Sequence, residues 1–330
     1  MKKYNLINNS LGWLMFAIAA ITYLSTIEPT ASFWDCPEFI SQGAKLEIGH
    51  PPGNPIFMLA ARTAINFCGG DLSKAAVAVN SMSALLSALT ILLLFWTITH
   101  LVKKLLVTDG EEDQMSLTQY LVIMGSGVVG ALAYTWSDTF WFSAVEAEVY
   151  AFSSFCTALV FWLILKWENR ADEPNSDRYL ILIAYVIGVS VAVHLLNLLC
   201  IPAIVLVFYY KKFKNTTVKG SLAALAVAGA IIVFILWGLV PGFVKVAQWF
   251  ELFFVNTLHM PYNTGVVIYT LLDFAVFAWA LYELYNQQNA TRIKVSVTLA
   301  VFISGMCFIG NGWIAPIVLL GGLVLYLFKF

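Results

Sequence analysis

Two carboxylates, a histidine and a proline-rich turn lie close together in the stretch ASFWDCPEFISQGAKLEIGHPPGNP, residues 31–55. Asp35 and Glu38 stand among large apolar side chains, where partial loss of water shifts pKa values and marks candidate functional sites. His50 follows, and three prolines in the next five residues restrict the chain beside it. A mere connector would not need such a rigid turn. The stretch is therefore our first candidate site.

A purely structural interpretation of the same residues stays open. Asp35, Pro37 and Glu38 have the spacing of a capping box, with Asp35 as N-cap and Glu38 reaching back to it. The next residues predict a short amphipathic helix on the membrane surface that Gly49 can end. Its apolar face would carry Phe39, Ile40, Gly43, Ala44 and Leu46.

A second acidic group lies in WSDTFWFSAVEAEVYA, residues 136–151. Glu146 and Glu148 are two residues apart, so on a helix they point to different faces and at most one enters a shared cavity. The alternative is that they cap the fourth membrane helix, with Trp136 and Trp141 in its interfacial belt.

Three further polar residues interrupt apolar runs. His194 and Asn197 have the i, i+3 spacing of one helix face, which suits either a site or a hydrogen bond between helices. Asp273 is expensive to bury in a membrane and is expected to face the interior of a bundle, without an assigned role.

These residues must be positioned by membrane helices. The chain has 330 residues, of which 60% are hydrophobic and 11% charged, against about 25% charged in soluble domains. Its mean hydropathy is +0.82. Long apolar runs predict an all-α polytopic membrane protein, because a barrel would show alternating segments of about ten residues. A net charge of −1 leaves no basic footprint for nucleic acid, and the five cysteines contain no C-x-x-C pair.

The runs predict ten membrane helices within a single domain, residues 1–330. The first is expected to be retained, because no A-x-A-like cleavage site follows it. The apolar stretch 179–210 is divided at His194. The predicted segments are 10–27, 72–102, 118–136, 148–167, 179–193, 195–210, 218–240, 264–285, 292–309 and 313–328.

The distribution of lysine and arginine predicts the orientation. With a cytoplasmic N-terminus, fourteen of these residues fall inside and four, Lys45, Arg62, Lys74 and Lys245, fall outside. Both termini are then cytoplasmic, and residues 28–71 form the first outer loop. The motif GSGVVG at residues 125–130 matches a dinucleotide fingerprint, but it lies in an apolar run and better fits close helix packing.

Three blocks of this sequence resemble a known family: YLSTIEPTASFWDCPEFISQGAKLEIGHPPGNPIFMLAAR, WSDTFWFSAVEAEVYA and VHLLNLL. They are similar to the protein O-mannosyltransferase-like family of bacterial membrane proteins, related to the animal enzyme that acts on plexin-type receptors. That family is grouped with the GT-C glycosyltransferases. The resemblance implies a sugar donor held as a lipid phosphate, a hydroxyl acceptor on the outer face, and an acidic base in the first outer loop.

Carried onto this chain, the resemblance makes Asp35 the base, with Glu38 beside it as the second catalytic residue. Positive or donor groups must meet the phosphate, and the outer candidates are Arg62, Lys74, His50 and His194. Arginine is best suited to hold a phosphate through two hydrogen bonds. The predicted substrate-binding residues are His50, Arg62, Glu146, Glu148, His194 and Asn197.

The expected activity is transfer of a hexose, mannose by the resemblance, from a polyprenyl phosphate to a serine or threonine of a translocated protein. The expected location is the bacterial inner membrane, with the site facing the periplasm. The partners are the lipid-linked donor, the protein acceptor and the bilayer. The carboxylates offer oxygen ligands for Mg²⁺ or Mn²⁺, but no cofactor and a metal-independent reaction are favoured. The alternatives are a transporter or flippase for lipid-linked sugars and a scaffolding membrane subunit.

Overall fold

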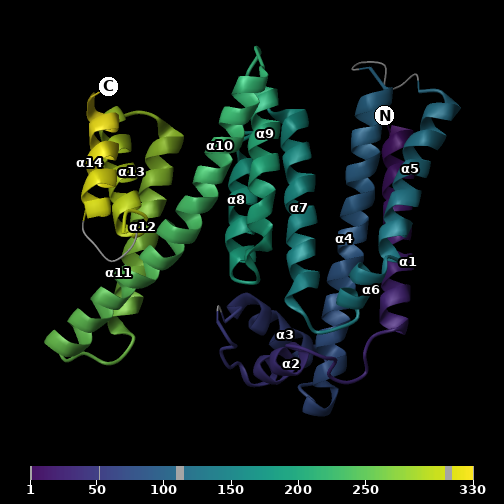
Figure 1. The fold of residues 1–330 in the computed structure, drawn as a ribbon, viewed down its shortest axis with the longest axis horizontal. Helices are drawn as coiled ribbons and strands as arrows, with labels where there is room; N and C mark the ends of the chain where they lie inside the picture. The colour runs from purple at the N-terminus through teal and green to yellow at the C-terminus, as the bar shows by residue number, and fades with distance from the viewer. Residues whose placement is uncertain (1, 52, 109–114, 309–313, 330) are drawn as a thin grey trace. The chain divides into compact units, whose positions relative to one another are not determined.

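The computed structural model describes residues 2–51, 53–108, 115–308 and 314–329 (Figure 1). These ranges contain helices and turns but no strand, which confirms an all-α membrane protein. They form two compact units, Met1–Ser221 and Leu222–Phe330.

The α-helices are α1 (Lys2–Ser25), α2 (Cys36–Lys45), α3 (Pro55–Phe67), α4 (Ala75–Leu106), α5 (Leu117–Thr135), α6 (Asp138–Ala144), α7 (Val149–Arg170), α8 (Arg178–Val191), α9 (Ile201–Lys212), α10 (Val218–Phe234), α11 (Val240–Leu252), α12 (Thr264–Asn286), α13 (Ala290–Ile303) and α14 (Ile314–Lys329). Short 3₁₀ turns η1 (Leu72–Lys74) and η3 (Leu195–Cys200), and π turns η4 (Ile235–Leu239) and η5 (Phe253–Thr257), join some of them.

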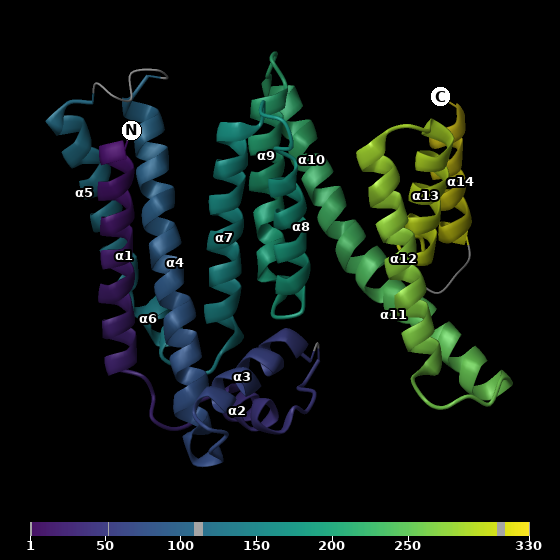
Figure 2. The ribbon, with the colours of Figure 1, turned by 180° about the vertical axis from the view of Figure 1, so that it is seen from behind.

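The first unit is a bundle of long helices that alternate in direction (Figures 1 and 2). The long helix α4 packs against α1, α5 and α7, and α7 packs in turn against α8 and α9. The three short helices α2, α3 and α6 all lie at the end where α1 finishes and α4 begins. We call this the acidic end, because it carries Asp35, Glu38, Glu146 and Glu148; the opposite end is the basic end.

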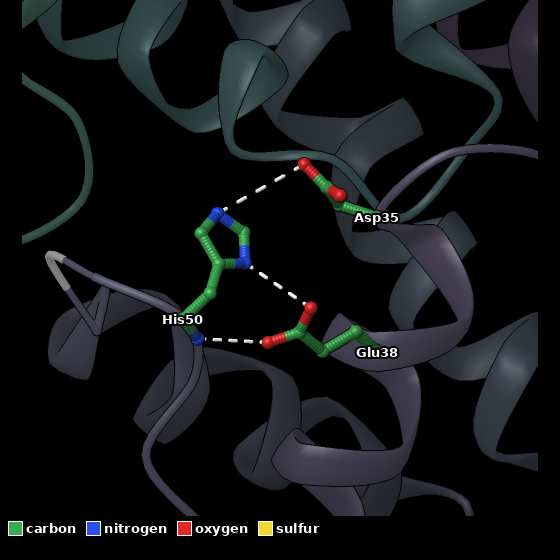
Figure 3. Close-up of side chains that lie close together, drawn as sticks. All are labelled: Asp35, Glu38 and His50. Carbon is green, nitrogen blue, oxygen red and sulfur yellow. Dashed lines mark hydrogen bonds and ion pairs between the residues drawn. The ribbon is translucent and has the colours of Figure 1, made fainter.

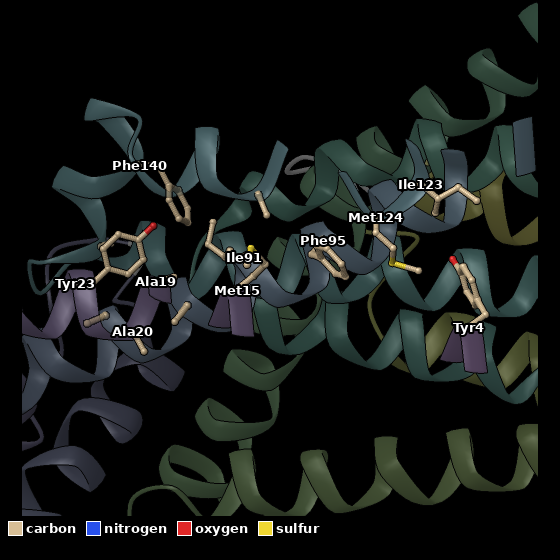
Figure 4. Packing of buried hydrophobic residues seen from close by; sticks show 14 residues of the cluster. Tyr4, Met15, Ala19, Ala20, Tyr23, Ile91, Phe95, Ile123, Met124 and Phe140 are labelled. Atoms are coloured by element: carbon tan, nitrogen blue, oxygen red, sulfur yellow. The ribbon is translucent and has the colours of Figure 1, made fainter. Parts of the chain in front are cut away.

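Small, aliphatic and aromatic side chains fill the core between α1, α4 and α5 (Figure 4). The Tyr23 ring is fully buried there, and its hydroxyl donates to the carbonyl oxygen of Thr135 at 2.9 Å. A Cβ added at Gly127 would lie 2.5 Å from Thr99, and one at Gly130 would lie 2.6 Å from Ile98. Glycine therefore lets α5 approach α4 closely, which confirms the packing interpretation of GSGVVG.

Each of the ten predicted membrane segments coincides with a helix. Among the described residues, seven helical stretches are long and apolar enough to cross a membrane, and α8 is a shorter apolar helix. The predicted break at His194 is confirmed, since the chain leaves helical conformation between α8 and η3. The predicted ends at 309 and 313 lie outside the described residues.

The predicted end of the seventh segment at residue 240 is wrong. The chain stays helical from Val218 to Thr257. A π turn precedes Pro241, the second residue of α11, and accommodates a proline that lacks a backbone donor. Helices α3 and α6 were also not predicted: both are shorter than a membrane span and lie in segments that were assigned to outer loops.

The second unit packs by close backbone contact. A Cβ added at Gly242 would lie 2.0 Å from the carbonyl oxygen of Gly305. The buried Tyr269 hydroxyl donates to the carbonyl oxygen of Ile303 at 2.6 Å, tying α12 to α13. Asp273 lies in α12, half-buried, and its Oδ1 has no hydrogen-bond partner among the described residues.

Candidate functional site

The predicted capping box at the start of α2 does not form. Asp35 is the N-cap residue, but its backbone is already helical (φ −86°, ψ −7°) and its carboxylate accepts no capping hydrogen bond. A capping side chain normally needs extended backbone at this position. The Glu38 carboxylate turns instead to His50 and Gln42, whose backbone N–H and Nε2 each donate to its Oε1 at 2.8 Å. The prediction that the two acids cap this helix is therefore wrong.

His50 lies between the two carboxylates (Figure 3). Its Nδ1 is 3.1 Å from Oε2 of Glu38, and its Nε2 is 4.0 Å from Oδ2 of Asp35. The Phe39 ring packs beside the imidazole, with 5.8 Å between ring centroids. The side chain of Asp35 is 54% exposed and that of Glu38 32%. These three residues form what we call the acid–histidine cluster, in which Asp35 is the more accessible carboxylate.

The charges within the cluster favour a protonated histidine. The hydrogen bond to Glu38 raises the pKa of His50, and the negative charges of Glu38 and Asp35 act in the same direction. The hydrogen bond from the backbone N–H of His50 lowers the pKa of Glu38, with Gln42 contributing. The pairing with Glu38 therefore favours the protonated form of His50 beside the accessible carboxylate of Asp35.

The hairpin of α2 and α3 brings His50 back to Glu38. Helix α2 ends at Lys45, because Leu46 adopts the left-handed conformation (φ 57°) and reverses the chain. Helix α2 therefore ends before Gly49, and Leu46 is exposed instead of joining the apolar face. The two helices touch where a Cβ at Gly43 would meet that of Ala61 at 2.7 Å.

Two polar contacts hold this hairpin. Arg62 on α3 donates from Nη1 to the carbonyl oxygen of Ala44 at 2.5 Å, which satisfies one of the unpaired carbonyls at the end of α2. At the start of α3, the N–H of Ile56 donates to the carbonyl oxygen of Ala192 at 3.2 Å. Arg62 thus has a structural partner, and its contact with a donor phosphate stays a prediction.

A buried pair of acids lies beside the cluster, in the connection between α6 and α7. Glu146 and Glu148 are only 5% and 6% exposed. The connection is a tight turn, with the N–H of Glu148 donating to the carbonyl oxygen of Glu146 at 2.9 Å, and not a helix. Both carboxylates therefore reach the Cys36 thiol, which lies 3.8 Å from Glu148. The expectation that only one could enter a shared space is wrong. Glu148 does cap α7 as predicted, since it accepts from the N–H of Val149.

Burial changes the protonation of this pair. Loss of water raises the pKa of Glu148 to about 7, and the charges of Asp35 and Glu146 push it in the same direction. Burial also raises the pKa of Glu146, whose Oε2 has no hydrogen-bond partner among the described residues. Near neutral pH the pair can therefore hold or release a proton close to Asp35.

The expectation of one shared helix face for His194 and Asn197 is wrong. His194 has extended backbone (φ −162°) ahead of η3, and its Nδ1 accepts from the N–H of Leu196. Its ring packs on Tyr150, and burial lowers its pKa. Asn197 is fully buried and accepts from Thr157 on α7 at 3.4 Å, while its Nδ2 has no hydrogen-bond partner among the described residues. Their roles in substrate binding stay predictions.

Three supporting residues were missed from the sequence. Gln42 lies one helical turn after Glu38, and this i, i+4 spacing is the signal that could have revealed it. Cys36 was assigned only to the core. Asn80 on α4 donates to the carbonyl oxygens of Glu28 and Thr30 and anchors the loop before α2, a contact that no local pattern indicates.

The ligand atoms of Asp35, Glu38 and His50 lie within 4.8 Å of one another. Two carboxylates and an imidazole are a donor set that a divalent cation can use. The hydrogen bonds of Glu38 and His50 to each other satisfy the same atoms without an ion. A metal-independent reaction stays a prediction.

The fold and the site together define a polytopic α-helical membrane protein with an acid–histidine cluster at one end of its bundle. The family model described as the Protein O-mannosyl-transferase TMEM260 N-terminal domain matches residues 35–217, more than half of the chain. The chain belongs to this family. The match begins at Asp35 and includes every predicted site residue.

Two curated proteins show the same likeness. Protein O-mannosyl-transferase TMEM260 of Mus musculus is 23% identical over 176 residues, which is 53% of this chain and 22% of that protein. Protein O-mannosyl-transferase tmem260 of Dictyostelium discoideum is 22% identical over 205 residues, 60% of this chain and 22% of that protein. The chain thus spans about a fifth of the length of these relatives. No solved structure matches it.

Proposed function

We propose that this chain is a GT-C-type glycosyltransferase of the bacterial inner membrane. It moves a hexose, mannose in our proposal, from a polyprenyl phosphate to a serine or threonine hydroxyl of a translocated protein. The names of its relatives support a protein O-mannosyltransferase activity. The acidic end faces the periplasm in this proposal, because most lysines and arginines lie toward the other side.

One observation carries the proposal. Asp35 lies at the N-cap position of a helix, yet its carboxylate makes no capping hydrogen bond and is exposed beside a histidine. A capping acid would be occupied by backbone N–H groups, whereas this one is available to a substrate. Because α2 lies at the end of a membrane bundle, it can meet both a lipid-linked donor and a water-exposed acceptor.

The reaction assigns a role to each group. The acceptor hydroxyl attacks the anomeric carbon, a new carbon–oxygen bond forms, and the bond to the phosphate oxygen breaks. Asp35 takes the hydroxyl proton, a form of help worth roughly 10²- to 10⁴-fold in rate. The imidazolium of His50 offers a positive donor to the leaving phosphate, and Glu38 orients it through Nδ1.

The test is the Asp35→Asn substitution in purified protein, assayed for sugar transfer from polyprenyl phosphate mannose to an acceptor peptide. Asparagine keeps the size of the side chain and removes the proton acceptor, so we expect transfer to fall roughly 10²-fold or more. The matched control is Asp71→Asn, because Asp71 is an exposed acid at the same end of the bundle that caps η1. Transfer by Asp35→Asn within a few-fold of the parent protein would refute the role of Asp35.

A further inference from the structure

A polar pocket lies at the basic end of the first unit, between α1, α4 and α7. A cavity of about 190 Å³ adjoins another of about 580 Å³. The two cavities share a lining that we call the basic pocket: Asn5, His100, Lys103, Lys166 and Asn169. It lies where α1 begins and where α4 and α7 finish, so it is far along the helices from the acid–histidine cluster.

Positive charge dominates this pocket among the described residues. Besides Lys103 and Lys166, its wider lining includes Lys104, Arg170 and Lys211. Two described carboxylates, Glu168 and Glu173, also line it; Glu168 is paired with Lys104, and Lys211 is paired with Asp172 beside the pocket at 3.1 Å. The excess of positive charge favours an anion.

Cationic side chains at helix C-termini also have an ordinary explanation, since they complement the helix dipole and the positive-inside rule. That explanation requires only that they project into solvent. Here Lys166 lies over the Trp162 ring at 4.9 Å and Lys103 over the Tyr4 ring at 5.1 Å, so both line a concave surface. The two lysines therefore form part of the pocket wall and do not simply project from an exposed helix end.

Three residues of the pocket wall carry buried polar atoms that lack a hydrogen-bond partner in the described part of the chain. Nε2 of His100, Oδ1 of Asn8 and Nε1 of Trp96 are each buried without a hydrogen-bond partner among the described residues. An unsatisfied buried polar group costs about 1–3 kcal/mol, so groups of this kind usually have a partner that completes them. Trp96 and Trp162 pack against each other at 5.8 Å beside these atoms.

We propose that the basic pocket binds the phosphate-bearing head group of an anionic lipid from the adjacent leaflet. The lipid is favoured over a soluble anion because the pocket opens between helices α1, α4 and α7, each long and apolar enough to span the bilayer. Basic pockets between membrane helices are a known type of site for anionic head groups. Lys103 and Lys166 contact the phosphate, and the amides of Asn5 and Asn169 meet the polar part of the head group.

The experiment uses the full chain in a zwitterionic detergent, with phosphatidylglycerol as the probe and phosphatidylcholine and inorganic phosphate as the comparison ligands. Lipid retention is measured by native mass spectrometry and by the rise in thermal midpoint. The variant is Lys103→Gln with Lys166→Gln. The control removes two charges from the same end of the bundle, outside the pocket, by Lys214→Gln with Lys219→Gln.

We expect saturable phosphatidylglycerol binding that weakens roughly tenfold or more in the pocket variant and stays within about twofold in the control. The conservative pair Lys103→Arg with Lys166→Arg keeps both charges and should keep binding, which guards against a folding defect in the glutamine variant. Equal retention of phosphatidylcholine, competition by millimolar inorganic phosphate, or equal loss in the control variant would overturn the proposal. Sugar transfer is not the readout, so failure here leaves the proposed function intact.

Discussion

At the scale of single residues, the pairing of His50 with Glu38 sets the charge next to Asp35. Glu38 raises the pKa of His50, so the imidazole keeps its proton to a higher pH than an isolated histidine does. The chain contains four histidines, which makes their titration tractable by NMR. The pairing can therefore be measured independently of any substrate.

We predict that Glu38→Gln lowers the titration midpoint of His50 toward its ordinary value, because the neutral amide no longer stabilises the imidazolium. The measurement is a pH series of spectra from protein with labelled histidine, with the His50 signal assigned by its loss in His50→Gln. In the control Glu47→Gln, which removes an exposed acid paired with Lys45, the midpoint should not move. An unchanged midpoint in Glu38→Gln would show that the pairing does not exist in solution.

Glu148 gives a second prediction at this scale, in the stability of the protein. Its folded pKa of about 7 exceeds its unfolded value, so the folded state holds a proton that the unfolded state releases. This contribution to stability is complete below about pH 4.5 and is lost as the pH rises through 7. We expect the thermal midpoint of Glu148→Gln, measured relative to that of the parent protein, to increase between pH 5 and pH 8. If the thermal midpoints of the two proteins changed with pH in parallel over this range, the raised pKa of Glu148 would be contradicted.

At the scale of elements, the site depends on how closely α2 approaches α3. Gly43 and Ala61 meet at this contact, and α2 carries Glu38 while the loop before α3 carries His50. Any change that separates the two helices changes the distance between Glu38 and His50. The small residue at position 43 is therefore a requirement of the site as well as of the packing.

We predict that Gly43→Ala destabilises the protein by about 1–3 kcal/mol through overpacking and weakens sugar transfer. Adding Ala61→Gly removes the opposing Cβ and should restore most of the lost stability and most of the lost sugar transfer. The control is Gly125→Ala on α5, where an added Cβ meets nothing within 4 Å and should be neutral or mildly stabilising. Thermal midpoints and transfer rates of the four proteins check the prediction. Failure of Ala61→Gly to rescue would place the defect elsewhere.

At the scale of the whole molecule, the native cysteines report the orientation. Cys68, at the end of α3, is exposed, while Cys36, Cys156, Cys200 and Cys307 are buried. We predict that an impermeant thiol reagent labels intact cells through Cys68 and that Cys68→Ser abolishes the label. In that background, Lys214→Cys should react only after the cells are broken. Labelling of Lys214→Cys in intact cells would reverse the orientation and remove the proposed periplasmic site.

The order of the apolar helices follows from the sequence alone, but their number as membrane spans does not: ten were predicted, and seven of the described helical stretches are long and apolar enough to cross a membrane. A helix that lies in lipid needs a long apolar run of residues. Each such run can be recognised in the sequence without knowing how the rest of the chain packs. The break at His194 is visible for the same reason, since a polar pair interrupts an apolar stretch. The prediction lost accuracy after residue 240, where amphipathic residues continue a helix that was predicted to end there.

The candidate residues were also visible in the sequence, but their arrangement was not. Residue types and aromatic neighbours selected Asp35, Glu38 and His50. The pairing of Glu38 with His50 needed the reversal at Leu46 and the return of the chain along α3. The entry of both Glu146 and Glu148 into one buried space needed a turn where a helix was expected. Apolar length is a property of the chain, whereas a distance between side chains depends on which helices pack together, and only the tertiary structure decides that.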